Sequence, residues 1–458
     1  MTSTLDLAGF GGAVVRPGDA DYDELRHVFN GMVDRRPAAI LRCASTADVV
    51  AAVNVARDGG ADVSVYGGGH SVTGAGVNDG GVVIDLRPLD GVDVDPVTST
   101  AHVQGGATWR VVDAATTAHG LAVTGGRVGS TGVGGLTLGS GSGWLERTYG
   151  LTCDSLTSCE VVVADGTVVR ASESENAELF WGLRGGSGNF GVVTDFEFTL
   201  RAIPPLLLAG LVLHPAPRGA DLLKFWRDFM LVAPDEVNSA IAFISAPPAD
   251  FVPEPVRGHP VIGLVVVYVG DPDKGQEVLR PLLEWGPPAV NLVQPMPYVA
   301  VQQMLDGANA PGMRNYWTSD FVDLPDEACE TFAAVANTHT SPLSQSLMVA
   351  GGGAVARVEN DAMAFGQRQA PFNIHLLNMW PPDPSMDAEQ IGWVKDFGAR
   401  MKPWTRQGAY LNYLGDEGID RVREAFGPEK FARLQALKDR YDPTNMFRHN
   451  QNIPPSTT

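Results

Sequence analysis

Residues 65–71 read VYGGGHS, and residues 125–143 read GGRVGSTGVGGLTLGSGSG. Both stretches carry far more glycine than an ordinary loop does, and the first contains a histidine, His70. Because glycine has no Cβ, its backbone adopts positive φ easily and approaches a ligand closely. Successive N–H groups in such conformations form concave sites for anions, typically phosphate. The two stretches therefore indicate a binding site whose walls are largely backbone.

A predicted strand leads into the first stretch, because residues 61–66 alternate in polarity and are rich in strand-forming side chains. The glycines are not a dinucleotide fingerprint, which opens a helix inside a βαβ unit, and no Gly-Lys-Ser/Thr follows them as in a P-loop. Two interpretations remain. One is a tight turn with an incidental surface histidine, and the other is a pyrophosphate cradle with His70 facing a cofactor ring.

Residues around the two stretches decide between these interpretations. Five segments follow one another along the first part of the chain: RPAAILRCASTADVVAAVNVARDGG, VSVYGGGHSVTG, GGVVIDL, GSTGVGGLTLGSGSGWLERTYGLTCDSL and LFWGLRGGSGNFGVVTDFEF. In this order they resemble the FAD-binding domain of the vanillyl-alcohol oxidase/PCMH flavoproteins, and most closely that of the berberine-bridge-enzyme-like FAD-linked oxidases. The segments NYLGDEG and YDPTNMFRHNQNI resemble the C-terminal part of the same proteins. The resemblance covers nearly the whole chain and is weakest in its middle third.

The resemblance implies that the cofactor is FAD and that His70 is joined covalently to the flavin 8α-methyl carbon. It also implies that Val193 lies at the adenine end of FAD, and that Thr131 lies over the flavin face, where it influences access of oxygen. The residues expected to bind or adjoin FAD, besides His70, are Gly67, Gly68, Gly69, Ser71, Gly129, Ser130, Thr131, Val133, Gly134, Gly139, Gly141, Cys153, Val193 and Asn450.

A cysteine is missing from the second glycine-rich stretch. Some proteins of the resembled family attach the flavin a second time, through a cysteine five residues before the Val-Gly-Gly of this stretch. Val128 occupies that position here, and Cys153 lies one motif later, in GLTCDSL. We therefore predict a single covalent bond, through His70, and a buried Cys153 thiol near the cofactor.

The resemblance and the order of predicted elements indicate an α+β fold. A PCMH-type FAD-binding domain of two subdomains is expected over residues 1–203, and a substrate domain with an antiparallel β-sheet flanked by helices over residues 204–404. Residues 405–458 are expected to return to the FAD-binding domain. In the middle part of the chain, apolar strand-like segments alternate with amphipathic helices, which favours a sheet covered on one face.

Local patterns predict individual elements. Residues 20–35 carry apolar side chains at helical spacing. Ser45 and Asp48 fit the N-cap box of a helix that follows them. The Asp-Gly pair at residues 165–166 is typical of a hairpin turn. The glycine content of residues 125–143 is expected to exclude a regular helix.

The segment AYLNY, residues 409–413, carries the predicted chemistry. In the alcohol and cannabinoid-type oxidases that this chain resembles, the tyrosine closing a Y-x-N-Y motif is the catalytic base. That role falls on Tyr413, with Tyr410 as the second candidate. A phenol with a pKa of about 10 is a poor base near pH 7 unless positive charge or polar donors lower its pKa. The alternative is an aromatic side chain that only packs on the sheet.

His375 lies on a predicted strand, residues 373–380. Residues two apart on a strand share a face, so His375 is able to reach a pocket on one side of the sheet. The alternative is a structural histidine with its hydrogen bonds satisfied. Asn378 and Trp380 have the opposite parity and are expected on the other face.

Composition excludes several classes of partner. The formal net charge is −20 at pH 7, and the 33 Lys and Arg residues form no basic block, which argues against nucleic acid and anionic membranes. The four cysteines are too few and too irregularly spaced for a disulfide framework or a zinc site, so no metal is expected. No run reaches the length of about 18 apolar residues that a membrane span needs. A cytoplasmic location is expected from these features, whereas the oligomeric state has no signature in the sequence.

These observations predict an FAD-linked oxidase. The expected reaction is hydride transfer from a C–OH group of a small molecule, sugar or secondary metabolite to covalently bound flavin, with O₂ as the electron acceptor. The amine-oxidising 6-hydroxynicotine branch of the resembled family has asparagine at the position of Tyr413, which favours a C–OH substrate here. The alternatives are an amine oxidase, a flavin-dependent oxygenase acting on a polyketide-like metabolite, and a non-catalytic FAD-binding protein.

Overall fold

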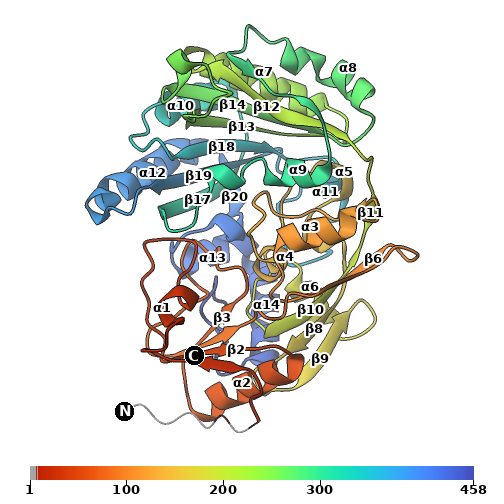
Figure 1. Cartoon of the computed structure of the whole chain (residues 1–458), viewed down its shortest axis with the longest axis vertical. Helices are drawn as coiled ribbons and strands as arrows, with labels where there is room; N and C mark the ends of the chain where they lie inside the picture. Colours follow the sequence, from red (N-terminus) through yellow and green to blue (C-terminus); the bar gives the residue numbers. More distant parts are fainter. Residues whose placement is uncertain (1–6, 8, 458) are drawn as a thin grey trace.

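The computed structural model describes residue 7 and residues 9–457. Residues 1–6, 8 and 458 lie outside the described residues, and with them part of the N-terminal segment that is expected to carry no export signal. Figure 1 shows two domains stacked along the long axis, the N-terminal domain below and a broad sheet covered by helices above. The combination of helices with parallel and antiparallel sheets confirms the predicted α+β class.

The first subdomain is built on a four-stranded sheet in the order β1-β2-β4-β3, in which β2, β4 and β3 run parallel. Its strands are β1 (Ala13–Val15), β2 (Ala39–Arg42), β3 (Val63–Tyr66) and β4 (Val82–Asp85). Helix α2 (Thr46–Asp58) connects β2 to β3 and begins after Ser45, whose side chain accepts a hydrogen bond from the Asp48 N–H at 3.2 Å. The predicted N-cap is therefore confirmed.

The predicted helix over residues 20–35 is wrong over most of its length, because only α1 (Tyr22–Leu25) is helical. Beyond α1 the Asn30 side chain donates hydrogen bonds to the carbonyls of Val72 at 2.6 Å and Asn315 at 3.0 Å. These bonds hold the segment in an irregular conformation that bridges the two domains, which sequence periodicity does not report.

The second subdomain is a five-stranded antiparallel sheet in the order β5-β6-β10-β8-β9. Its strands are β5 (Val92–Asp95), β6 (Thr100–Gln104), β8 (Leu156–Val162), β9 (Val168–Ser172) and β10 (Val192–Thr199), and its helices are α3 (Trp109–Thr117) and α6 (Ala177–Leu183). Gly166 has a φ of +86° in the turn between β8 and β9, which confirms the hairpin. Strands β7 (Leu121–Ala122) and β11 (Arg201–Ala202) pair separately.

The second glycine-rich stretch contains a short helix, contrary to prediction. This helix, α4 (Val133–Leu138), begins after the extended residue Gly132. The Val133 and Leu138 side chains are buried in the core of the second subdomain, and the Val133 N–H donates to the Ala107 carbonyl at 2.9 Å. Tertiary packing of this kind outweighs the low helix propensity of glycine. A further short helix, α5 (Glu146–Tyr149), follows it.

The second domain contains a nine-stranded antiparallel sheet, in the order β15-β12-β14-β13-β18-β19-β17-β20 with β16 beside β12. Its strands are β12 (Leu207–Pro215), β13 (Val237–Ser245), β14 (Pro260–Tyr268), β15 (Val290–Asn291), β16 (Gln294–Met296), β17 (Arg314–Val322), β18 (Gln345–Ala350), β19 (Phe372–Trp380) and β20 (Thr405–Ala409). Its helices are α7 (Gly219–Val232), α8 (Pro272–Leu283), α9 (Tyr298–Gln303), α10 (Asp326–Ala336), α11 (Ala354–Arg357) and α12 (Asp387–Met401).

Helices α7, α8, α10 and α12 cover one face of this sheet (Figure 1). Alternate strand residues point the other way: Met348 lies in the core beneath these helices, whereas Val349 is packed with Trp144 of the N-terminal domain. The large sheet is therefore covered by helices on one face, as the alternation of strands and helices predicted, and its other face lies over the N-terminal domain.

The return of the chain to the N-terminal domain begins after β20 rather than at residue 405. Strand β20 pairs with β17 and belongs to the edge of the large sheet. A 3₁₀ turn, η7 (Leu411–Tyr413), then precedes α13 (Ile419–Phe426) and α14 (Pro428–Tyr441). Side chains of α14 join the core of the second subdomain, and Figure 1 shows these C-terminal helices, in blue, beside the N-terminal domain.

A buried ion pair fixes the end of α14. Lys438 and Asp442 lie 2.6 Å apart, and both side chains are fully buried. The Lys438 ammonium also donates to the carbonyls of Asn189 and Phe447, each at 2.9 Å. The Asp442 carboxylate accepts the N–H groups of Met446 at 2.7 Å and Phe447 at 2.8 Å. Each charge is therefore compensated inside the protein.

Replacing Lys438 by methionine is expected to lower the free energy of unfolding by about 3–5 kcal/mol, because the Asp442 charge then stays buried without its partner. Chemical denaturation at neutral pH measures the change. The matched control is Lys274→Met at an exposed position of α8, for which we expect a change within about 0.5 kcal/mol. Equal stability of the two variants would contradict the importance assigned to the pair.

Candidate active site

A cavity lies between the N-terminal domain and the face of the large sheet that the helices leave uncovered. The volume of the cavity is about 290 Å³. Its lower side includes both predicted glycine-rich stretches, a third loop around residues 187–193 and the C-terminal residues 447–451. Side chains of β13, β17, β18 and β19 form the opposite side. The cavity thus collects segments that lie far apart in the sequence.

The two glycine-rich stretches touch backbone to backbone. A Cβ on Gly68 would lie 2.1 Å from the Gly132 nitrogen, and a Cβ on Gly132 would lie 2.3 Å from the Gly68 nitrogen. Gly69 has a φ of +69°, and a Cβ there would lie 2.4 Å from the Tyr66 hydroxyl. Only glycine fits these positions without displacing its neighbours. The glycines therefore serve close contact between chain segments as well as access for a ligand.

His70 stands at the end of the first stretch, with its ring on the cavity wall. Its Nε2 lies 2.9 Å from Ser130 Oγ, and the ring stacks on Phe29 with centroids 4.3 Å apart. Burial lowers the pKa of His70 to about 4, so the imidazole is neutral near pH 7. Because Ser130 engages Nε2, Nδ1 is the ring nitrogen left for another partner.

The predicted cofactor residues fall into two groups. Those that line the cavity are Gly67, Gly68, Gly69, His70, Ser71, Thr131, Gly134, Val193 and Asn450. Those that are not part of the lining are Gly129, Ser130, Val133, Gly139, Gly141 and Cys153. In this second group, the Gly129 N–H donates to Asp306 at 2.8 Å, and a Cβ on Gly139 would lie 1.8 Å from Asn412 Oδ1. Gly129 and Gly139 therefore support the wall rather than form its surface, whereas the exposed Ser130 contacts the His70 ring.

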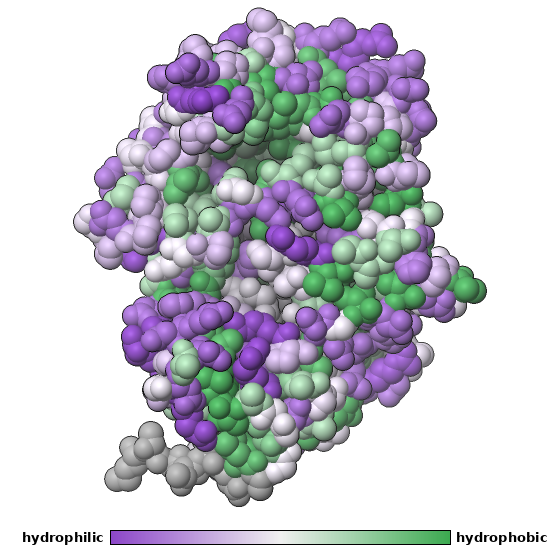
Figure 2. Space-filling model, viewed as in Figure 1, coloured by the Kyte–Doolittle hydropathy of each residue, from purple (hydrophilic) through white to green (hydrophobic). Residues whose placement is uncertain are grey.

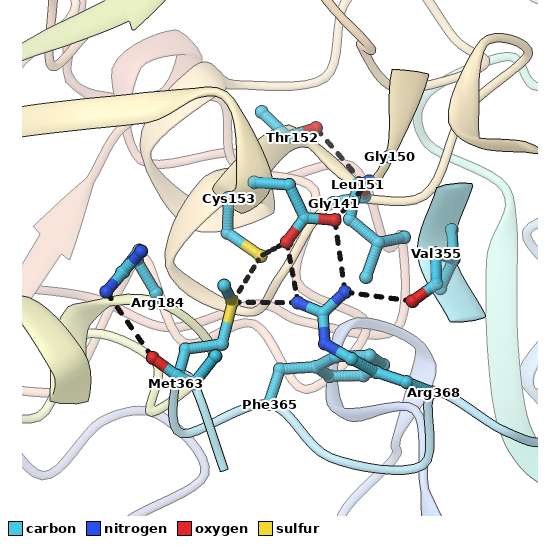
Figure 3. A network of polar contacts seen from close by, with 12 residues as sticks. Gly141, Gly150, Leu151, Thr152, Cys153, Arg184, Val355, Met363, Phe365 and Arg368 are labelled. Carbon is cyan, nitrogen blue, oxygen red and sulfur yellow. Dashed lines mark hydrogen bonds and ion pairs between the residues drawn. The ribbon is translucent and has the colours of Figure 1, made fainter. Parts of the chain in front are cut away.

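Cys153 is buried behind the cavity, in the polar network of Figure 3. Its sulfur lies 3.4 Å from Met363 Sδ, and the adjacent Asp154 forms a buried ion pair with Arg368 at 2.6 Å. Burial raises the pKa of the Cys153 thiol, which keeps it protonated and poorly reactive. The four cysteines are free and buried, as predicted, but the Cys153 side chain does not reach the cavity lining.

Tyr413, at the end of η7, lines the cavity beside His375 of β19. The two ring centroids are 4.5 Å apart, and that of Trp317 lies 5.7 Å from Tyr413. His375 Nδ1 lies 3.0 Å from Ser319 Oγ. Burial, with the nearby Arg127 charge as a smaller cause, lowers the pKa of His375 to about 3, so this ring is also neutral near pH 7.

Strand parity in β19 is as predicted. His375 faces the cavity, whereas Asn378 and Trp380 face α12. The Asn378 side chain donates to the Gln390 carbonyl at 2.9 Å, and Trp380 Nε1 donates to Asp387 at 3.0 Å. His375 therefore combines the two interpretations that the sequence left open, since its ring is hydrogen-bonded and also lines the cavity.

Tyr410 has a different environment from Tyr413. Its hydroxyl accepts hydrogen bonds from the Ser142 N–H at 2.8 Å and from Asn412 Nδ2 at 3.3 Å. Burial raises the pKa of Tyr410 above its usual value. It lines a smaller cavity behind His375 rather than the main one. Of the two candidate bases, Tyr413 is the one that faces the main cavity.

Arg127 is a residue of the site that the motif analysis missed. Among the described residues that line the cavity, it is the only Lys, Arg, Asp or Glu. Its Nη1 donates to Ser142 Oγ at 2.9 Å, and its Nη2 donates to the Gly143 carbonyl at 3.3 Å and to Glu146 at 3.1 Å. A sequence signal existed, because Arg127 is the only charged residue in the stretch from residue 125 to residue 143.

The side of the cavity formed by the large sheet is mostly apolar. Its apolar side chains are Ala240, Trp317, Leu347, Val349 and Leu377, and its polar ones are Gln345 and His375. Leu305 and Asn309, from the segment after α9, complete this side. An apolar wall with a few fixed polar groups suits a ligand with an apolar body and few polar substituents.

Other kinds of site are not indicated in the described part of the chain. No cluster of three or more His, Cys, Asp or Glu side chains there is arranged to hold a metal ion. None of the described helices has the length and apolar character needed to cross a membrane. On the face in Figure 2, hydrophilic residues surround several separate hydrophobic patches. The cavity between the domains is therefore the principal candidate site.

Two family profiles match the parts of the chain that build this cavity. One, described as an FAD binding domain, matches residues 37–172. The other, described as berberine and berberine like, matches residues 409–454. The first match contains His70 and the second contains Tyr413, so both cover residues that line the cavity.

Proteins of similar length match over nearly their whole extent. The chain is 29% identical over 456 residues to the (R)-6-hydroxynicotine oxidase of Paenarthrobacter nicotinovorans, covering 97% of both chains. It is 30% identical over 461 residues to YgaK, an uncharacterized FAD-linked oxidoreductase of Bacillus subtilis strain 168, again covering 97% of both. The xylooligosaccharide oxidase from Myceliophthora thermophila C1, solved in complex with xylobiose, has a TM-score of 0.86 and 25% identity over 99% of both chains.

Proposed function

The chain belongs to the berberine-bridge-enzyme-like FAD-linked oxidases, and from this membership we propose that it oxidises a C–OH group of a small molecule. In the proposed reaction the alcohol loses a hydride from carbon and a proton from oxygen and becomes a carbonyl compound. O₂ receives the two electrons together with two protons and leaves as hydrogen peroxide. FAD, when bound, supplies the redox chemistry, and the protein supplies orientation and proton transfer.

The residues of the cavity fit FAD. Gly135 and Gly188 line it, and apart from adjacent parts of their own chain segment no heavy atom lies within 4 Å of the point where a Cβ on either would stand, so the space in front of them is open. The backbone around them is suited to a pyrophosphate. Asn450 Oδ1 is buried and has no hydrogen-bond partner among the described residues, which leaves an acceptor for an N–H group of a ligand.

We propose that His70 holds the flavin through one covalent bond. Two features support this role: the imidazole is neutral near pH 7, and Ser130 engages Nε2 but leaves Nδ1 free. Val128 lines the cavity where some relatives carry a second attachment residue, and valine is unable to form such a bond.

The position of Tyr413 in the cavity wall carries the proposal of a C–OH substrate. Of the two candidate tyrosines, Tyr413 is the one whose ionised hydroxyl is available to accept a proton there, because the Tyr410 hydroxyl is occupied by Ser142 and Asn412. Beside it His375 stays neutral and hydrogen-bonded to Ser319, so this ring orients rather than exchanges protons. We assign to Tyr413 the removal of the hydroxyl proton as the hydride leaves the adjacent carbon.

The apolar side of the cavity narrows the substrate class. A sugar exposes hydroxyls on most of its carbons, and burying them against Leu347, Val349 and Leu377 would leave many without hydrogen bonds. An alcohol with an apolar or aromatic body, as in secondary metabolites, suits this wall better. Oxidation of an amine is the second candidate, because the similar (R)-6-hydroxynicotine oxidase is named for such a substrate.

A substrate panel with two readouts tests the proposal. The purified protein is mixed without oxygen with aromatic and aliphatic alcohols, oligosaccharides and cyclic amines, and bleaching of the yellow flavin is followed. Hydrogen peroxide is then measured in air. We expect alcohols with an apolar body to bleach the flavin and to yield peroxide. Bleaching by amines alone would reject the C–OH assignment, and bleaching without peroxide would reject O₂ as the acceptor.

A further inference from the structure

Tyr413 must lose its own proton before it can accept one from a substrate, and its buried position opposes that ionisation. Burial raises the pKa of Tyr413 above its ordinary value, since the phenolate loses its solvation. The titratable and charged groups around Tyr413 are Arg127, Glu146, His375 and Tyr410. His375 and Tyr410 are uncharged near neutral pH, so they offer the phenolate no opposite charge.

Arg127 supplies the missing positive charge. Its guanidinium acts on the pKa of Tyr413 in the direction opposite to burial, whereas the Glu146 carboxylate acts with burial. Arg127 is held firmly, because its two Nη atoms donate to three acceptors and the guanidinium lies 4.8 Å from the centre of the Trp144 ring. Only 9% of its side chain is exposed.

One donor of this guanidinium is not used by the protein. Arg127 Nε is buried and makes no hydrogen bond, although both Nη atoms are engaged. A buried donor without a partner costs free energy, and native proteins tolerate it mainly at functional positions. The engaged Nη atoms tie Arg127 to the Ser142 hydroxyl, the Gly143 carbonyl and Glu146. Arg127 and Tyr413 line the same cavity, so Arg127 brings a free donor to the site of Tyr413.

We propose that Arg127, the charged residue in the wall of the cavity that Tyr413 also lines, is a positioning residue that eases the ionisation of Tyr413, with Glu146 moderating its effect. The inference rests on the proposed role of Tyr413. Glu146 receives Nη2 of Arg127 and the Gly143 N–H, each at 3.1 Å, and thereby partly neutralises the guanidinium charge. The ion pair sets the strength of the base, and the two partners have opposite effects on it.

Ultraviolet titration of Tyr413 tests this proposal without any turnover. The absorbance of tyrosinate is followed with pH in each holoenzyme variant, and the curve of the same variant carrying Tyr413→Phe is subtracted. Arg127→Gln is expected to move the ionisation of Tyr413 up by about one to two pH units, because loss of the opposite charge removes an interaction that favours the ionised form. Arg127→Lys should restore much of the wild-type position, and Glu146→Gln should move it down.

Arg110→Gln is the matched control. Arg110 contacts the same loop region through Asp306 at 2.8 Å but does not line the cavity, so its loss should leave the titration unchanged. Circular dichroism verifies that each variant is folded. Equal titration curves for wild type and Arg127→Gln, or equal shifts in Arg127→Gln and Arg110→Gln, would overturn the proposal.

The pH dependence of kcat/KM gives a second readout once a substrate is known. Because the deprotonated phenol is the active form, activity rises with pH, and Arg127→Gln should displace this rise to higher pH, while Glu146→Gln displaces it to lower pH. If no alcohol is oxidised, the proposed function fails, yet the titration of Tyr413 still decides the role of Arg127. A shift in Arg127→Gln titration with an unmoved activity profile would reject Tyr413 as the base instead.

Discussion

In the Tyr413→Phe variant we expect kcat/KM for an alcohol substrate to fall by about 10²–10⁴-fold, the usual contribution of a positioned general base. The flavin content should remain that of the wild type, because phenylalanine preserves the ring that packs beside His375 and Trp317. Only the proton acceptor is lost. The rate of anaerobic flavin bleaching measures the effect directly, since it is independent of the later reaction with O₂.

The same substitution at Tyr410 is the matched comparison. The Tyr410 hydroxyl accepts hydrogen bonds from Ser142 and Asn412 but does not line the main cavity, so Tyr410→Phe should lower the rate of bleaching by less than about tenfold. A larger loss in Tyr410→Phe than in Tyr413→Phe would transfer the role of base to Tyr410. Retention of full activity by both variants would leave the proposed proton transfer without a residue to perform it.

The His70→Ala variant is expected to lose all flavin that survives acid precipitation. We assign the covalent attachment to His70, because the Val128 side chain in the cavity lining is unable to form such a bond and the Cys153 side chain is not part of that lining. Wild-type protein should give a yellow pellet after acid treatment, and its intact mass should exceed that of the polypeptide by one FAD. The variant should give a white pellet and the mass of the polypeptide alone.

Cys153→Ala controls for indirect damage to the cofactor site. It removes a buried thiol from the network of Figure 3 without touching the cavity lining. Its pellet should remain yellow and its mass should still include one FAD. Loss of bound flavin in Cys153→Ala with retention in His70→Ala would reverse the assignment, and a colourless wild-type pellet would exclude covalent attachment altogether.

Features with a local physical cause were predictable from the sequence. The Ser45 cap of α2 and the turn at Gly166 depend on a few adjacent residues, and both are found where expected. The short helix inside the second glycine-rich stretch was missed, since the burial of Val133 and Leu138 decides it. The irregular path after α1 was missed for a similar reason, because Asn30 bonds to carbonyls of both domains.

In the candidate site, too, local features were predictable from the sequence, whereas features that depend on tertiary contacts were not. Glycine-rich loops and His70 are recognisable because their motifs are contiguous in sequence. The choice between Tyr410 and Tyr413 requires the structure, because it depends on the hydrogen bond that the Ser142 N–H donates to the Tyr410 hydroxyl. Arg127 lies in the second glycine-rich stretch, far from Tyr413 in the sequence. Its electrostatic effect on Tyr413 arises only because the C-terminal segment folds back to the N-terminal domain.

The two faces of the large sheet have different roles, and successive residues of a strand belong to alternate faces. In β18 and β19 one set of alternate residues packs against the covering helices, and the other set, including Leu347, Val349 and Leu377, lines the cavity. Substitutions at cavity-lining positions such as Leu347 and Leu377 therefore leave the contacts with the helical layer in place. A variant library confined to the cavity-lining residues of β18 and β19 is therefore the natural starting point for changing the substrate specificity of the enzyme.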